Sequence, residues 1–300
     1  MALDQDKIRK TIRKLHKSLD SQSHWRSPEK VHGLRTRSRR FEAVMRALML
    51  DQEQSGRSLL KAVNRIFKQA GKVRDMDVLT RFASGLPTDG QDPNHGACLA
   101  QLLQHLQEKR QKSALKLHAR IAKHSKAVSH LLKQFSSRLP GTSNPTDAQR
   151  LQSNATAFAL QLCGELTAWP RLTVANMHPY RLKVKQLRYT LQMAEGNDST
   201  FVNMLQETTD AIGEWHDWSQ LLEITTEVLK RHPKCSVLNA IRSAASAKRR
   251  QALHIANTMR KKSLGSEAHK SHELKTTLSE TVLAAIATLA NPPSSSQRKS

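Results

Sequence analysis

The sequence predicts an all-α protein built from two related halves, and three observations support this prediction. The 300 residues include only 11 Gly and 10 Pro, so long segments run without a helix breaker. Within these segments apolar residues recur at the three- and four-residue spacing that gives a helix one buried face. A basic motif also occurs twice, 146 residues apart, which indicates an internal duplication.

The first half is expected to contain four helices. They lie near residues 5–20, from Ser27 to about Leu50, near 55–70 and near 98–136. Ser27 and Pro28 are a helix-capping residue and a proline suited to the first helical position, so they predict the start of the second helix. The third helix is expected to break at Gly71, and residues 85–97, rich in Gly and Pro, to form a loop.

The second half is expected to repeat this series of helices. It begins after the segment from Pro140 to Pro145, whose Pro, Gly, Ser and Asn predict a linker. Its helices are expected near residues 147–168, around His178, near 199–212 with a break at Gly213, and near 215–231, 236–262 and 282–289. The predicted organisation is a first half at 1–139, a linker at 140–147, a second half at 148–290 and a disordered tail at 291–300.

The repeated motif reads His-x2-Arg-x-[Arg/Lys]-x-[Arg/Lys], with a large apolar residue nine positions after the His. It begins at His32 and again at His178. A second segment follows each copy of the motif, and its residues also match between the two halves. Gly71 corresponds to Gly213, Asp75 to Asp217, and Leu79 to Leu221. The duplication therefore covers most of each half.

Helical geometry places the basic residues of each motif on one narrow ridge, which spans an arc of about 60° in the first copy. The first ridge contains His32, Arg35, Arg39 and Arg46, and the second contains His178, Arg181, Lys185 and Arg188. The opposite faces are apolar, with Leu34, Phe41, Val44, Met45 and Leu48 on the first helix and Tyr180, Val184, Leu187 and Leu191 on the second. Solvated helix faces usually mix charges of both signs. We therefore expect an anion to lie along the two ridges.

The composition favours a polyanionic partner. Lys and Arg exceed Asp and Glu by 24 charges, and such a field attracts polyanions without specifying a fold. The three Cys residues have no metal-ligand spacing and the 14 His form no paired cluster, so we expect neither a metal nor a cofactor. The odd Cys count favours a reduced, cytoplasmic compartment, and no segment predicts a signal peptide or a membrane span.

The duplicated His helix with its following Gly-x3-Asp segment resembles the conserved histidine α-helical domain (CHAD) family over nearly the whole chain. The resemblance implies two pseudo-symmetric four-helix bundles with a basic groove between them that binds inorganic polyphosphate. Some members of the family carry a catalytic domain for triphosphates as well. This chain has no room for one, so the resemblance implies a binding module.

Carried over by position, the resemblance implies that polyphosphate contacts His32, Arg35, Arg39 and Arg40 of the first copy and His178, Arg181, Lys185 and Arg188 of the second. Further candidate contacts are Arg46 on the first ridge, Arg37 and Lys183, which match between the copies, and Arg74 in the segment that follows the first copy. Glu42 and Gln186 depart from the family pattern at the far end of each ridge. Arg37 and Lys183 project toward the apolar side of their helices, so they either extend to a rim or face the other bundle.

Structural roles remain open for several of these residues. The two motif His could be structural and bonded to an acid. Asp75 and Asp217 are expected to orient Arg74, His216 or a cation of the ridge, because a carboxylate beside a polyanion would repel it. Trp215 and Trp218 are expected to pack in the interior rather than to stack on bases. The basic runs on the long helices are expected to be solvated.

These patterns are compatible with three functions. The favoured one is non-catalytic binding of inorganic polyphosphate at polyphosphate granules, with granule proteins or polyphosphate enzymes as candidate partners. The alternative is non-specific binding to a nucleic-acid backbone, since no base-reading motif is visible. An enzyme would need a nucleophile or clustered carboxylates, and the acids here are scattered.

Overall fold

The protein was analysed as a computed structural model, which describes residues 3–20, 27–88, 90–138, 145–194 and 200–265. These ranges contain eight α-helices, a short 3-10 helix and a single isolated bridge between Leu3 and Ala194, but no strand. The elements are α1 (Gln5–Asp20), α2 (Pro28–Ala47), η1 (Leu50–Gln52), α3 (Gln54–Ser84), α4 (His95–Arg138), α5 (Pro145–Thr167), α6 (Val174–Leu191), α7 (Thr200–Val228) and α8 (Ser236–Ser263). The all-α prediction is confirmed.

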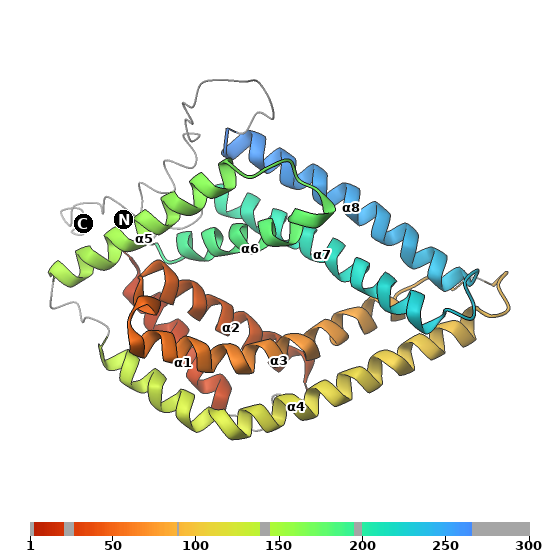
Figure 1. The fold of residues 1–300 in the computed structure, drawn as a ribbon, viewed down its shortest axis with the longest axis horizontal. Helices are drawn as coiled ribbons and strands as arrows, with labels where there is room; N and C mark the ends of the chain where they lie inside the picture. The colour runs from red at the N-terminus through yellow and green to blue at the C-terminus, as the bar shows by residue number, and fades with distance from the viewer. Residues whose placement is uncertain (1–2, 21–26, 89, 139–144, 195–199, 266–300) are drawn as a thin grey trace, which may run out of the picture.

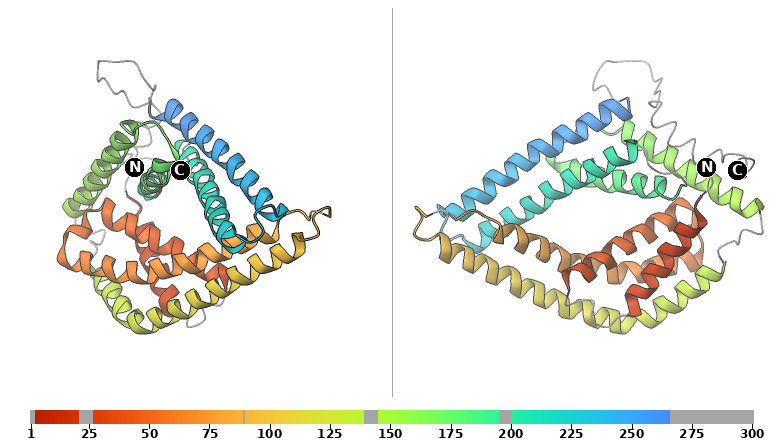
Figure 2. Two further views of the ribbon diagram at one scale, coloured as in Figure 1. Left: turned by 45° about the vertical axis from the view of Figure 1, so that its right-hand side comes forward. Right: turned by 180° about the vertical axis from the view of Figure 1, so that it is seen from behind.

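Helices α1 to α4 occupy one side of the molecule and α5 to α8 the other (Figure 1). The long pairs α3/α4 and α7/α8 form two arms that converge at one end, where the loops at their tips lie close together (Figure 2). His95 and Ser236 join these tips, with His95 Nδ1 2.8 Å from Ser236 Oγ. Between the arms α2 packs against α5 and α6, and α3 packs against α7.

Local sequence explains where the two motif helices begin. Ser27 has extended backbone geometry and its hydroxyl accepts a hydrogen bond from the Lys30 N–H, with Pro28 in the first turn, so the predicted cap of α2 is confirmed. Helix α6 begins with a capping box. There Asn176 Oδ1 accepts a hydrogen bond from the Thr173 N–H at 2.8 Å.

The apolar faces of α2 and α6 form part of the core. All the residues predicted for these two faces are buried, including Phe41 and Tyr180. The buried apolar residues form two clusters, and each cluster takes members from both sides of the molecule. One cluster surrounds α1, α2, α5 and α6, and the other lies at the converging tips. Because the two sides share these clusters, burial fixes the placement of the two motif helices relative to each other.

The predicted helix breaks at Gly71 and Gly213 are wrong. Helix α3 runs from Gln54 to Ser84 and α7 from Thr200 to Val228, so each Gly lies inside a continuous helix. A single Gly costs a helix only about 1 kcal/mol relative to Ala, and tertiary contacts offset such a cost. Helix α4 begins at His95, slightly earlier than predicted. The helix expected near 282–289 and the tail at 291–300 lie outside the described residues.

The described helices give no evidence of a membrane-spanning segment. None of them combines the length and the apolar character that a membrane-spanning helix requires.

Candidate anion-binding site

The two predicted ridges meet where α2 packs against α6 and α3 packs against α7. Arg35 and Arg39 of α2 depress the pKa of Lys185 on α6, and Lys185 in turn helps to depress the pKa of His32. Charges from the two sides of the molecule therefore act on one another at short range. We call this group the central cluster. It comprises His32, Arg35 and Arg39 of α2, Arg74 and Asp75 of α3, His178, Arg181 and Lys185 of α6, and His216 and Asp217 of α7.

Arg35 is bonded to Asp75, one of the two carboxylates predicted to orient a cation. Its Nη1 donates to Asp75 Oδ1 at 2.6 Å, and about a third of each side chain remains exposed. The guanidinium also lies above Gly71, since a Cβ placed on that residue would be 4.0 Å from Arg35 Cζ. The repeated Gly thus marks the surface of α3 that faces the arginine.

Arg181 repeats this placement on α6 with different bonds. Its Nε donates to the Thr209 carbonyl of α7 at 2.8 Å, and its guanidinium presses against Gly213, where a Cβ would lie 2.9 Å from Cζ. Burial lowers the pKa of Arg181, while the charge of Asp217 raises it. The second Gly therefore makes room for a largely enclosed cation.

Asp217 differs from its counterpart Asp75. Burial raises the pKa of Asp217 to about 6, and the charge of Asp75 adds to that rise, although Arg181 and other arginines oppose it. Within the ranges that the structure covers, Asp217 forms no ion pair. At neutral pH this carboxylate is therefore still mostly ionised, and its negative charge acts on Arg181, Arg35 and Arg74 without forming an ion pair with any of them.

Lys185 is the most strongly perturbed cation of the cluster. Burial lowers its pKa, and repulsion from Arg181, Arg188, Arg35 and Arg39 adds to this effect, so that the pKa is about 7. The charges that act most strongly on Lys185 are all positive. The ammonium therefore loses its proton readily unless an anion enters.

The histidines of the cluster lie against one another and against cations. The His178 and His216 rings have centroids 4.5 Å apart at 44°, and His178 Nδ1 is buried without a hydrogen-bond partner. Burial lowers the pKa of all three, to about 4 for His216, and nearby arginines lower those of His32 and His178 further. No hydrogen bond joins His32 or His178 to a carboxylate in the described ranges, in contrast to the structural role left open above.

Arg37 and Lys183 bind the helix that precedes their own. Arg37 Nη1 donates to the Ser18 hydroxyl of α1, and Lys183 Nζ lies 2.6 Å from Glu165 Oε2 of α5. The two positions are equivalent in the duplication, and both tie a motif helix to its neighbour. Their bonds point away from the central cluster.

Arg188 and Arg40 are bonded or directed to elements outside the central cluster, although the charge of Arg188 still acts on Lys185. Arg188 is buried and its Nη1 donates to Gln206 Oε1 and to Thr209 Oγ1 of α7, while its guanidinium lies 4.6 Å from the Tyr189 ring centroid. Arg40 faces α1. The structure therefore divides the predicted residues between the cluster, the helix contacts and the α1 side.

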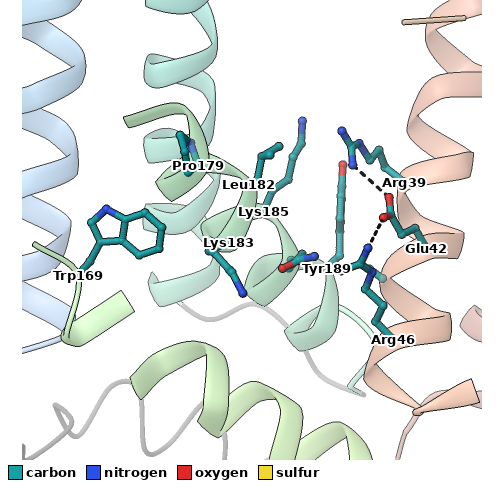
Figure 3. A pocket seen from close by; sticks show the side chains of 11 residues that line it. Arg39, Glu42, Arg46, Trp169, Pro179, Leu182, Lys183, Lys185 and Tyr189 are labelled. Atoms are coloured by element: carbon teal, nitrogen blue, oxygen red, sulfur yellow. Dashed lines mark hydrogen bonds and ion pairs between the residues drawn. The ribbon is translucent and has the colours of Figure 1, made fainter. Parts of the chain in front are cut away.

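A cavity of about 320 Å³ extends the central cluster toward the far ends of α2 and α6. Buried Glu42 accepts hydrogen bonds from Arg39 and Arg46, each at 3.0 Å, and so fixes both guanidiniums on one wall (Figure 3). Lys183 and Lys185 line the opposite wall, with Tyr189 between the walls. We call this the α2–α6 cavity. The departure from the family pattern at Glu42 thus organises two arginines.

A second cavity, of about 540 Å³, opens on the other side of Arg181 and includes Arg81 of α3. Arg81 was not among the predicted residues. It lies seven residues after Arg74, a spacing that puts both on one face of α3, so its position in the sequence could have indicated it. Asp217 also lines this cavity, together with three further acids on α7. The side chains that line this second cavity therefore carry charges of both signs, whereas the strongest charges around Lys185 are all positive.

Comparisons with known proteins support the fold. The family model described as the CHAD domain matches residues 7–223. PptA from Streptomyces chartreusis has a similar solved structure, with a TM-score of 0.61, 16% sequence identity and coverage of 85% of this chain and 95% of that chain. The crystal structure of the CHAD domain from the plant Ricinus communis gives a TM-score of 0.56 at 18% identity, covering 87% and 92%. No curated protein matches the sequence.

Proposed function

This chain belongs to the CHAD domain family, and from that premise we propose that it binds inorganic polyphosphate along the central cluster. The family resemblance suggests the ligand, and the geometry of the site supports the suggestion. The proposed contacts come from both motif helices, with Arg35 and Arg39 on one side and Arg181 and Lys185 on the other.

The observation that carries this proposal is the environment of Lys185. Burial, together with repulsion by four arginines from both sides of the molecule, lowers its pKa to about 7. Such an arrangement costs free energy in the empty protein, and a polyanion would relieve that cost by supplying negative charge beside these cations. Arg guanidiniums bind two oxygens at once and a Lys ammonium binds as a point charge, so both suit a chain of phosphates.

A polymer without bases fits the site better than a nucleic acid. Single-stranded nucleic acids are usually bound by aromatic side chains that stack on bases. Here Trp218 stacks on Phe82 with ring centroids 4.6 Å apart, and Trp215 is buried, as predicted. Neither tryptophan is a free stacking platform, so we expect a nucleic acid to compete through its backbone.

We propose binding rather than catalysis because two carboxylates beside the proposed phosphate contacts are engaged with arginines. Asp75 is bonded to Arg35, and Glu42 to two arginines. These carboxylates position the guanidiniums that would contact phosphate. We further propose that the protein associates with polyphosphate granules and acts there with other granule proteins or polyphosphate enzymes.

A competition titration tests the proposed function. Labelled long-chain polyphosphate is bound to the protein and displaced with unlabelled polyphosphate or with duplex DNA at matched phosphate. Arg35→Ala and Arg181→Ala should each weaken binding by about 1–3 kcal/mol, the value of a lost charge-assisted hydrogen bond. Lys126→Ala and Lys261→Ala remove exposed cations outside the cluster and should cost much less.

Two results would overturn the proposal. If all four variants lost affinity equally, binding would follow the general positive field rather than the central cluster. If duplex DNA displaced the label as effectively as polyphosphate, the protein would be a general polyanion binder.

A further inference from the structure

A third cavity, of about 380 Å³, lies between α1, α2 and the end of α6. Four cations line it, together with Tyr189 and Gln192. These cations are Lys7, Lys10 and Lys14 of α1 and Arg40 of α2. We call it the α1 cavity. It belongs neither to the central cluster nor to the contacts that tie α2 to α1 through Ser18.

Helix α1 is built to present this row of lysines. Its apolar residues Ile8, Ile12, Leu15 and Leu19 are buried in the core. Lys7, Lys10 and Lys14 follow one another at three- and four-residue spacing, so they share a face of the helix. All three are exposed. Packing of the apolar face therefore holds the basic face over the cavity.

Most of the charge in the α1 cavity is not neutralised by the protein. Lys7 Nζ lies 3.3 Å from Asp4 Oδ2 and donates to the Ala194 carbonyl at 3.0 Å. Within the described ranges no ion pair joins Lys10, Lys14 or Arg40 to a carboxylate. Three positive charges thus converge on one hollow without an acid among its lining residues.

The α1 cavity adjoins the α2–α6 cavity. Tyr189 lines both. On α2 the successive residues Arg39 and Arg40 line one cavity each. A chain that left the central cluster through the α2–α6 cavity would therefore meet the α1 cavity next, on the other side of the Tyr189 ring.

We propose that the α1 cavity is a second phosphate-binding site, which takes the segment of a long polyphosphate chain that continues beyond the central cluster. This inference rests on the proposed function. Lys10 and Lys14 bind phosphate oxygens as point charges, and the guanidinium of Arg40 binds them as a fork. The protein then favours long chains, because a second contact on the same molecule multiplies affinity. A short chain held at the central cluster gains nothing from it.

Binding of two ligands of different length tests this site. The ligands are tripolyphosphate and long-chain polyphosphate, titrated at equal ionic strength into the full-length protein. Lys10→Ala combined with Lys14→Ala should reduce affinity for the long chain by about tenfold and leave affinity for tripolyphosphate unchanged. Both lysines are exposed, so the double variant should fold normally. The matched control is Lys116→Ala with Arg120→Ala, an exposed pair at the same spacing on α4.

The outcomes separate this inference from the function on which it rests. If Arg181→Ala weakens binding of both ligands but the α1 variant changes neither, the central cluster stands and the α1 site is wrong. If the α1 variant weakens both ligands equally, or if the α4 control loses as much long-chain affinity, the cations act through a general field and the site is also wrong. If wild-type protein binds neither ligand, the proposed function itself fails.

Discussion

The guanidinium of Arg181 packs directly against Gly213, and the equivalent pair, Arg35 and Gly71, is looser. A Cβ on Gly213 would lie 2.9 Å from Arg181 Cζ and closer still to Nη2, whereas a Cβ on Gly71 would lie 4.0 Å from Arg35 Cζ. The first distance requires the arginine to move, and the second is ordinary van der Waals contact. The duplication has therefore kept both glycines in sequence, but the structure requires only one of them.

The two glycines should respond differently to alanine. Gly213→Ala displaces Arg181 from its bond to the Thr209 carbonyl and should weaken polyphosphate binding by about 1–2 kcal/mol. Gly71→Ala should leave affinity unchanged and raise the free energy of unfolding by up to about 1 kcal/mol, because Ala favours the helix. Calorimetric titration and urea denaturation of both variants measure the two effects. Equal losses of affinity would show that Arg181 does not depend on Gly213.

Binding should weaken steeply as salt concentration rises, because cations that contact phosphate release counterions from the polymer. For a single-stranded polyanion the slope of log affinity against log salt is about −0.7 per phosphate neutralised. If about six to ten phosphates are neutralised, the slope lies between about −4 and −7. Fluorescence titrations across a salt series give this slope. A slope near zero would rule out binding by a row of cations.

Lys185 should make binding dependent on pH above neutrality. Its pKa is about 7 in the empty protein, and phosphates beside it should raise that value, so binding takes up a proton. Below pH 7 Lys185 is protonated in both states and contributes no pH dependence. Above pH 7 affinity should fall by up to about tenfold per pH unit until the pKa of the bound state is reached.

Lys185→Arg provides the control, because arginine keeps its charge over this range. The variant should bind with an affinity that changes much less between about pH 7 and pH 8.5. Calorimetry in buffers of different ionisation enthalpy should count fewer protons taken up than for wild type. Identical proton uptake by both would assign the pH dependence to groups other than Lys185.

Asp217 should affect stability in the acidic range. Its pKa in the folded protein is about 6, above the 3.8 expected for the unfolded chain. Protonation therefore favours the folded state, and this contribution is complete below about pH 4 and lost as pH rises through about 6. Asp217→Asn should gain stability relative to wild type between these pH values, by at most about 2 kcal/mol. Urea denaturation of both ligand-free proteins checks this, and a constant difference would refute it.

The sequence by itself determined the helical class, the duplication and the face that each motif helix buries. These features follow from local rules. The spacing of Leu34 and Phe41 or of Tyr180 and Val184 defines one apolar face, and the ridge of cations must then lie opposite. The cap at Ser27 was also predictable, because capping needs only the neighbouring backbone. The duplication could be predicted by comparing the sequence of one half with that of the other.

Only the tertiary structure decided which cations meet and which are used elsewhere. Arg37 and Lys183 match between the halves but bind Ser18 and Glu165 on neighbouring helices, and Arg188 is buried against α7. Gly71 and Gly213 look like helix breakers in sequence, yet they lie inside long helices where an arginine packs on them. A periodic pattern specifies the direction of a side chain on its own helix. Its partners depend on which helix packs opposite, and the shared core makes that choice.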